Sequence, residues 1–309
     1  MERMSELAIS LSSVERRFGS VRAVDGLDLE VPAGSVTVLL GPNGAGKTTT
    51  VRLITGALRA HAGTVRVLGL DPETGGDEIR QRTGVVPPKP ALFDQLDGWD
   101  NLRFTADIWG VDHDNVLPAA TRFGIDHALD QEVGGYSTGM RTRLALARAV
   151  LHDPDILLLD EPTAGLDPES SRAVLDLIRE LAGRGRTIVM CTHLLHEAEG
   201  IADQVVMMGA GKSQAAGPPT RLAAEYLRQP TVVFDAENRA GLETITDRPG
   251  VVSASWNGAL HVKMNDLDAL PDLVAAMVAD GVRLTRVEPQ LPTLEHLYFE
   301  VQRTLRSEA

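Results

Sequence analysis

The chain has 309 residues and a mass of 33.2 kDa, which allows two domains and a sizeable core. Its formal net charge of −13 and pI near 5.1 disfavour a basic surface, so we expect no nucleic-acid partner. A single cysteine, Cys191, excludes an internal disulfide framework and any multi-cysteine metal site.

The amino-terminal segment, residues 1–6, has no apolar stretch behind a basic one, so the sequence predicts no secretory signal. No window approaches the roughly 18 consecutive apolar residues of a membrane span. Cys191 closes the apolar run that begins at Thr187, so we expect a buried thiol. These features predict a protein of the reducing cytoplasm that reaches a membrane only through a partner.

Two strand-like segments, Ala8 to Leu11 and Leu27 to Val31, precede a phosphate-binding loop. The loop reads Gly-Pro-Asn-Gly-Ala-Gly-Lys-Thr at residues 41–48, a full match to G-x-x-x-x-G-K-(S/T). It joins the apolar run Val36 to Leu40 to the helix-compatible stretch Thr49 to Leu58, as this chemistry requires. A Gly-rich turn without a ligand is the alternative, and the context argues against it.

Each part of the loop has a physical role with a nucleoside triphosphate. The glycines let backbone N–H groups close around the phosphates, and the following helix adds its positive dipole. Lys47 can reach the β- and γ-phosphates, and the Thr48 hydroxyl can hold Mg²⁺. The predicted nucleotide-binding residues here are Gly41, Pro42, Asn43, Gly44, Ala45, Gly46, Lys47, Thr48 and Thr49.

Strands alternate with helices through the middle of the chain. Val65 to Leu68 is strand-like, and residues 89–150 are helical in pattern. The spacing of Trp99, Leu102, Phe104 and Ile108 predicts that they line one helix face. The apolar runs at 156–159 and 187–191 flank a helical segment at 169–181. This alternation predicts a mainly parallel sheet buried on both faces.

Polar residues follow two of these strands. Asp160 and Glu161 come after the strand at 156–159, so one carboxylate can serve Mg²⁺ and the other the attacking water. An Asp-Glu pair is common elsewhere, but the phosphate loop favours the catalytic interpretation. His193 follows the next strand; such histidines are more often structural, yet this one could donate a hydrogen bond to the γ-phosphate.

A second, partial phosphate-loop pattern occurs at Gly209-Ala210-Gly211-Lys212-Ser213. Val206 stands where the first glycine is required, and no helix start follows. We interpret it as a turn after the strand Gln204 to Met208.

The pattern changes near residue 229. Strands are expected at 231–235, 251–256, 259–264 and 282–287, and helices at 238–246, 267–279 and 292–305. Asn257-Gly258 is a strong hairpin signal between two of the strands. The order β-α-β-β-α-β predicts a small ferredoxin-like α+β domain at 229–309, after a first domain at 1–228.

Several motifs occur together in the order and spacing of the nucleotide-binding domains of ABC transporters. They are the phosphate loop, Tyr136-Ser137-Thr138-Gly139-Met140, the run 156–163, Gly165-Leu166-Asp167 and His193. The resemblance covers about residues 7–228. It implies an α/β P-loop NTPase cassette with a mainly parallel core sheet, an antiparallel amino-terminal β part and a helical subdomain at about 89–150.

The resemblance also implies roles for individual residues. Phe18 stacks on adenine, and Lys47, Thr48 and Asp160 contact phosphate and magnesium. Glu161 is the general base and His193 the switch histidine. Asp167 crosses a dimer interface, and Ser137 with Gly139 closes on ATP held by the opposite subunit. Without the family, Phe18 would be interpreted as an ordinary core aromatic.

Two positions depart from the family pattern. Pro88 stands where a glutamine normally bridges Mg²⁺, the attacking water and the membrane subunit, and proline offers no amide. Thr138 replaces the first glycine of Ser137-Thr138-Gly139, adding a side chain where a phosphate approaches. We expect altered coupling or a water ligand at the first position and weakened binding at the second.

The closing segment Pro292 to Tyr298 resembles the ABC-2 group, similar to ATPases of daunorubicin-type drug-resistance exporters. The resemblance implies a homodimeric, Mg²⁺-dependent ATPase, peripheral on the inner face of the cell membrane, that drives export through an ABC-2 permease. The alternatives are a hydrolysis-impaired nucleotide sensor and a soluble ABC ATPase. A groove for the permease is expected at residues 89–110, from Leu92, Phe93, Leu96 and Trp99, unless these four pack in the core.

Overall fold

The computed structural model describes residues 6–227, 229–242, 244–290 and 293–308. The chain forms two compact units, one reaching to Pro219 and one starting at Thr220. Within the described ranges, no helix has the length and apolar character needed to cross a membrane.

A six-stranded sheet forms the centre of the first unit, in the order β5-β6-β7-β3-β8-β9. All neighbours are parallel except β8 and β9. Every residue of β3, β6 and β7 is buried, which explains their continuous apolar sequences and confirms the predicted parallel sheet. The strands are β5 (Thr83–Val86), β6 (Ile156–Asp160), β7 (Thr187–Thr192), β3 (Val36–Leu40), β8 (Gln204–Gly209) and β9 (Lys212–Gly217).

An antiparallel sheet in the order β2-β1-β4 lies against the same core. Its strands are β1 (Leu7–Phe18), β2 (Val21–Pro32) and β4 (Ala62–Val67). The first two are much longer than predicted, because their polar outer positions hide the strand signal while alternate residues stay buried. Helix α1 (Lys47–Ile54) packs Val51, Leu53 and Ile54 into the core that both sheets share.

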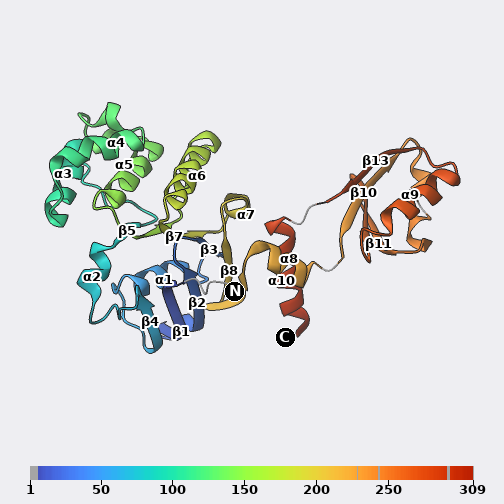
Figure 1. The fold of residues 1–309 in the computed structure, drawn as a ribbon, viewed down its shortest axis with the longest axis horizontal. Helices are drawn as coiled ribbons and strands as arrows, with labels where there is room; N and C mark the ends of the chain where they lie inside the picture. Colours follow the sequence, from blue (N-terminus) through green and yellow to red (C-terminus); the bar gives the residue numbers. More distant parts are fainter. Residues whose placement is uncertain (1–5, 228, 243, 291–292, 309) are drawn as a thin grey trace. The chain divides into compact units, whose positions relative to one another are not determined.

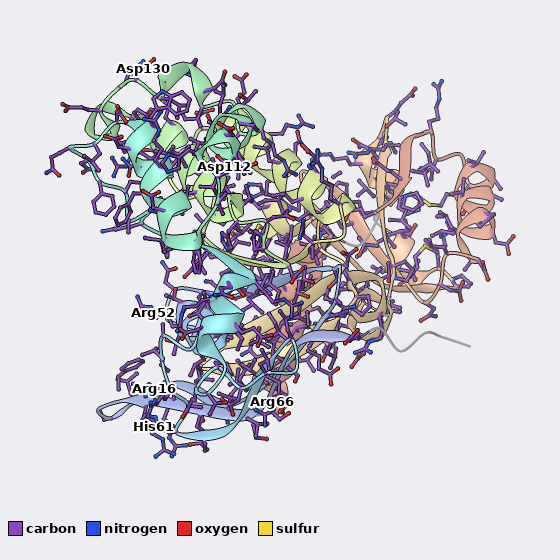
Figure 2. The ribbon with its side chains drawn as sticks, turned by 60° about the vertical axis from the view of Figure 1, so that its left-hand side comes forward. Arg16, Arg52, His61, Arg66, Asp112 and Asp130 are labelled. Carbon is purple, nitrogen blue, oxygen red and sulfur yellow. The ribbon has the colours of Figure 1, made fainter. Side chains whose placement is uncertain are left out.

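The helices α3 (Gly98–Trp109), α4 (Val116–Arg122) and α5 (Thr138–Val150) gather in the green part of the chain (Figure 1). In Figure 2, Arg52 of α1 lies between these helices, marked by Asp112 and Asp130, and the antiparallel sheet, marked by Arg16 and His61. The remaining helices of this unit are α2 (Gly76–Gln81), α6 (Pro168–Gly183) and α7 (Leu195–Ala198).

The predicted apolar face of α3 is wrong in detail. Leu102 is fully buried together with Ala106, whereas Phe104 and Ile108 are 47% and 60% exposed. The helix therefore has two apolar faces. Leu102 and the small Ala106 face the core, whereas Phe104 and Ile108 face a cavity.

The second unit contains an antiparallel sheet in the order β11-β12-β10-β13, built on its own apolar cluster. This order and the Asn257-Gly258 hairpin agree with the expected ferredoxin-like arrangement. The helix expected at 238–246 is wrong; two 3₁₀ turns, Arg239–Leu242 and Ile245–Asp247, stand there. The other elements are α8 (Pro219–Tyr226), β10 (Thr231–Ala236), β11 (Val251–Asn257), β12 (Ala259–Met264), α9 (Leu270–Ala279), β13 (Leu284–Pro289) and α10 (Leu294–Glu308). Pro292 lies outside the described residues.

Candidate active site

The phosphate loop connects β3 to α1 at the carboxyl edge of the parallel sheet. Gly44 and Gly46 adopt φ of +85° and +105°, which only glycine adopts without strain. A Cβ on Gly41 would stand 2.3 Å from the Met208 carbonyl oxygen, and one on Gly46 would stand 2.5 Å from that of Ala23. Two glycines are thus required by packing, while the exposed residues Pro42, Asn43 and Gly44 face outward.

Lys47 is buried and folds back on this loop. Its Nζ donates to the Gly41 carbonyl oxygen at 2.6 Å and to that of Pro42 at 3.4 Å. The same nitrogen lies 3.4 Å from Glu161 Oε1. Its charge is therefore balanced by one carboxylate and loop carbonyls, which a polyphosphate could replace.

Glu161 and His193 meet beside the loop, although they are 32 residues apart in sequence. They follow adjacent parallel strands, β6 and β7, so both emerge at the same edge. His193 Nδ1 lies 2.9 Å from Glu161 Oε2. The Glu161 side chain is 14% exposed, and each of its carboxylate oxygens has one partner: Lys47 contacts Oε1 and His193 contacts Oε2.

Asp160 fits a cation-binding role. Its side chain is 1% exposed, and neither carboxylate oxygen accepts a hydrogen bond from any residue that the structure describes. Burial is the main effect and raises the pKa of Asp160, as does the neighbouring charge of Glu161; the Thr48 hydroxyl opposes this from nearby without reaching hydrogen-bond geometry, and the charges of Lys47 and Arg52 also oppose it. A buried, unpaired carboxylate is costly, and a hard cation between it and the Thr48 oxygen would relieve that cost.

Cys191 lies opposite Asp160 on β7 and is fully buried, as the sequence predicts. Burial raises the pKa of its thiol well above the ordinary value, so the side chain stays neutral. Its carbonyl oxygen accepts a hydrogen bond of 2.9 Å from the Glu161 N–H. This bond helps to hold Glu161 in the left-handed backbone region, at φ +53°.

Ser137, Gly139 and Asp167 form a second group. Ser137 caps α5 by accepting from the Met140 N–H, and Asp167 caps α6 by accepting from the N–H groups of residues 169 and 170. Ser170 lies close to both caps. Its hydroxyl donates a hydrogen bond to Asp167, and its Oγ lies 3.5 Å from the position that a Cβ on Gly139 would occupy. Sequence reasoning missed Ser170, and only its position three residues after a helix cap could have indicated it.

In the described residues, no hydrogen bond or ion pair joins Ser137, Gly139 or Asp167 to the phosphate loop. Ser137 and Asp167 are exposed. Phe18, at the end of β1, is also exposed, and the Arg16 guanidinium lies 4.9 Å above its ring. It is therefore not a core aromatic.

A largely apolar cavity of about 560 Å³ lies between α1, β5, α3 and the end of α5. Of the four expected groove residues, Phe93 lines it, whereas Leu92, Leu96 and Trp99 do not. None of the four is part of the buried core. Helix α3 contributes Phe104, Ile108 and Trp109 to the lining, and further aliphatic residues come from α1, α2 and β5, namely Val51, Ile79 and Val85. Pro88 also lines this cavity, as do Thr48 and Asp160.

Comparison with known proteins places this geometry in context. Residues 24–164 match the ABC transporter family. The chain is 34% identical to the daunorubicin resistance ATP-binding protein DrrA3 of Streptomyces coeruleorubidus, over 96% of each chain. It is 38% identical to the daunorubicin/doxorubicin resistance ATP-binding protein DrrA of Streptomyces peucetius, over 96% of this chain and 87% of that one. The solved structure of cbiO1 from Clostridium perfringens, part of the ABC transporter complex cbiONQ, is similar with a TM-score of 0.65 and 28% identity, over 72% of this chain and 92% of that one.

Proposed function

Since this chain belongs to the ABC transporter family and is one of its ATP-hydrolysing ATP-binding subunits, we propose that it powers export through a separate ABC-2-type membrane subunit at the inner face of the cell membrane. The observation that carries the proposal is the convergence of Lys47, Glu161 and His193 beside a buried, unpartnered Asp160. The two relatives named for daunorubicin resistance support drug-like cargo.

The phosphate chain of ATP binds in the loop at residues 41–48. Backbone N–H groups of the loop and the start of α1 surround the phosphates, and Lys47 exchanges its loop carbonyls for them. The exposed ring of Phe18 stacks on the adenine. Thr48 and Asp160 would hold Mg²⁺, since both carboxylate oxygens of Asp160 are buried and accept no hydrogen bond from a described residue. Bound Mg²⁺ would neutralise charge on the β- and γ-phosphates.

Hydrolysis requires a water molecule positioned in line with the bond to the leaving ADP. Glu161 accepts a proton from this water as its oxygen attacks the γ-phosphorus. His193 holds Oε2 of Glu161 and can donate to the γ-phosphate. Lys47 stabilises negative charge that accumulates on the phosphate oxygens.

The active unit is a head-to-tail homodimer. Ser137 and Gly139 of one copy close on ATP held by the other, and Asp167 crosses the interface. The exposure of Ser137 and Asp167 in the single chain supports this arrangement. The apolar cavity lined by Phe93, Phe104 and Ile108 receives a short helix of the membrane subunit, because an open apolar cavity of this size is suited to a helix side chain.

The test is ATP hydrolysis by the purified full-length protein and by Glu161→Gln. The amide keeps the shape of the side chain but cannot accept the proton, so we expect turnover to fall by about 10²-fold or more. ATP affinity, measured with a fluorescent analogue, is expected to stay within about twofold. Equal turnover of the parent and Glu161→Gln would show that Glu161 is not the base.

The same measurement decides the alternative of a hydrolysis-impaired nucleotide sensor. That alternative requires the parent to bind ATP without turnover above the Glu161→Gln background. The complete set of Lys47, Asp160, Glu161 and His193 argues against it.

A further inference from the structure

A smaller cavity of about 320 Å³ reaches Glu161 from the side of the helices. Both departures from the family pattern, Pro88 and Thr138, line it. Pro88 belongs to the segment Pro87-Pro88-Lys89-Pro90, which follows strand β5, and Lys89 lines the same cavity. Since each proline fixes its own φ and restricts the residue before it, the segment holds Lys89 in a narrow range of backbone conformations.

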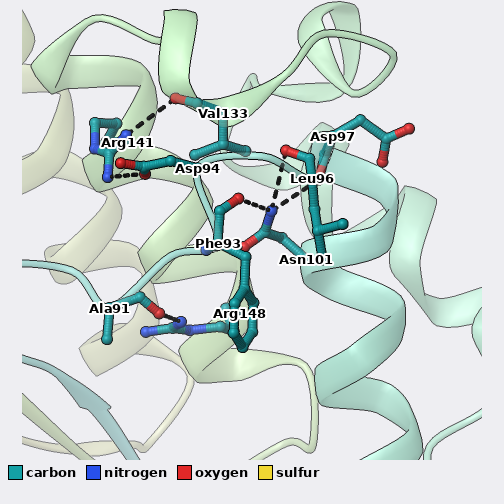
Figure 3. A network of polar contacts seen from close by, with 9 residues as sticks. All are labelled: Ala91, Phe93, Asp94, Leu96, Asp97, Asn101, Val133, Arg141 and Arg148. Carbon is teal, nitrogen blue, oxygen red and sulfur yellow. Dashed lines mark hydrogen bonds and ion pairs between the residues drawn. The ribbon is translucent and has the colours of Figure 1, made fainter.

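The chain that follows this segment is clamped. Asn101 of α3 is 2% exposed; its Oδ1 accepts from the Phe93 N–H, and its Nδ2 donates to the carbonyl oxygens of Phe93 and Asp97 (Figure 3). Arg148 donates to the Ala91 carbonyl oxygen. With β5 ending at Val86 on the other side, the proline segment is fixed at both ends.

Two other cations are near the cavity, but both are committed. Arg141 lines it, yet its guanidinium is bound to Asp94 at 2.6 Å and to the Val133 carbonyl oxygen at 3.0 Å (Figure 3). Lys47 lies 3.4 Å from Glu161, but it is also the lysine proposed to bind the phosphates. Lys89 is exposed, and the described contacts include no ion pair or hydrogen bond for its ammonium group.

Nucleotide binding changes the charges around Glu161. When Lys47 turns to the phosphates, His193 is the one side chain among the described contacts that still holds the Glu161 carboxylate, and it carries a charge only if protonated. The Glu161 carboxylate must then stay beside a polyphosphate of the same sign, which repels it. A second cation on the cavity side would hold the carboxylate in place and reduce this repulsion.

We propose that Lys89 is a positioning residue for hydrolysis, which takes over from Lys47 as the lysine that faces Glu161 when nucleotide is bound. The inference rests on the proposed role of Glu161. This role would explain the Pro-Pro-Lys-Pro segment. Where the family has the neutral amide of a glutamine at position 88, this chain has a proline followed by the cation of Lys89. Asp160 and Glu161 are the acidic groups at this point, and Lys47, His193, Lys89 and Arg141 are the basic ones.

The test compares Lys89→Met and Lys89→Arg with the parent as full-length proteins, measuring kcat and KM for ATP. Because Lys89 acts through Glu161 and not on the phosphates, Lys89→Met is expected to lower kcat about fivefold to tenfold and to leave KM within about twofold. Lys89→Arg is expected to restore at least half of the loss, because it returns the charge. Lys263→Met is the control for removing a lysine elsewhere and is expected to match the parent.

Each outcome decides the proposal. An unchanged kcat in Lys89→Met, a loss that Lys89→Arg does not restore, or a rise in KM equal to the fall in kcat would overturn it. Glu161→Gln is measured alongside. If the parent does not exceed Glu161→Gln, the proposed hydrolytic function fails and the Lys89 role with it; if the parent turns over and Lys89→Met equals it, only the Lys89 role fails.

Discussion

At the scale of single residues, the candidate site contains a non-glycine residue, Glu161, in the strained left-handed backbone region. Glu161 has φ +53°, a conformation that costs a non-glycine residue about 1–2 kcal/mol. The hydrogen bond from its N–H to Cys191 and the contacts of its two carboxylate oxygens compensate in part. The left-handed turn directs the Glu161 side chain to the phosphate loop, whereas Asp160 before it stays in the strand.

Two glycines of the phosphate loop provide a matched pair for a stability prediction. Gly44 and Gly46 both have positive φ, but a Cβ on Gly44 meets nothing within 4 Å, whereas one on Gly46 meets the Ala23 carbonyl oxygen at 2.5 Å. Gly44→Ala therefore carries backbone strain of about 1 kcal/mol, and Gly46→Ala adds a backbone clash of similar or greater size. We expect the Tm of Gly46→Ala, measured without nucleotide, to fall at least twice as far as that of Gly44→Ala. Equal shifts would mean that the loop moves away from Ala23 at little cost.

At the scale of elements, one buried amide connects α3 to the loop before it. Asn101→Ala leaves the Phe93 N–H without its acceptor, whereas the carbonyl oxygens of Phe93 and Asp97 lose the side-chain donor but keep backbone donors. We therefore expect a loss of about 1–3 kcal/mol and faster hydrogen exchange at the Phe93 amide. Asn101→Asp is the control, because it keeps the acceptor for Phe93 and loses only the donors. Its Phe93 amide should exchange more slowly than in Asn101→Ala. Similar exchange in both variants would contradict the role assigned to the Asn101 oxygen.

The elements also show what the sequence could and could not predict. The mainly apolar strands β3, β6 and β7 and the glycine-lysine loop are local signals, so the parallel sheet and the meeting of residues at one of its edges could be inferred. The two faces of α3 could not, because the burial of Leu102 and the exposure of Phe104 depend on what packs beside them. The failed helix at 238–246 contains Gly241, where a Cβ would stand 3.1 Å from Val282. Periodicity did not indicate the cavity that joins Pro88, Thr138 and Glu161, since it depends on three segments that are distant in sequence.

At the scale of the whole molecule, dimerisation is expected to depend on nucleotide, since in the proposed head-to-tail dimer each site would borrow Ser137 and Gly139 from a second copy. In Glu161→Gln, where ATP persists, Mg-ATP is expected to convert monomer to dimer, and Mg-ADP is not. Light scattering on the full-length protein at saturating nucleotide measures this. A monomer with Mg-ATP would contradict the head-to-tail arrangement in the isolated subunit, and a dimer of equal strength with ADP would show that the γ-phosphate does not control it.

The coupling of hydrolysis to the membrane subunit is tested best at Pro88. This residue lines both the apolar cavity proposed for the partner's helix and the smaller cavity that reaches Glu161. Proline supplies neither a side-chain amide nor an N–H, so Pro88→Gln introduces a group that can contact Mg²⁺ and the attacking water. We expect it to raise basal ATP turnover or to change the stimulation by the membrane subunit. Nucleotide affinity should stay nearly unchanged, because the phosphate loop provides most of the binding.

The measurement is turnover of the parent and of Pro88→Gln, each alone and reconstituted with the membrane subunit. Identical values in both conditions would exclude position 88 from catalysis and coupling, and would leave the neighbouring Lys89 as the residue through which this segment acts on the site.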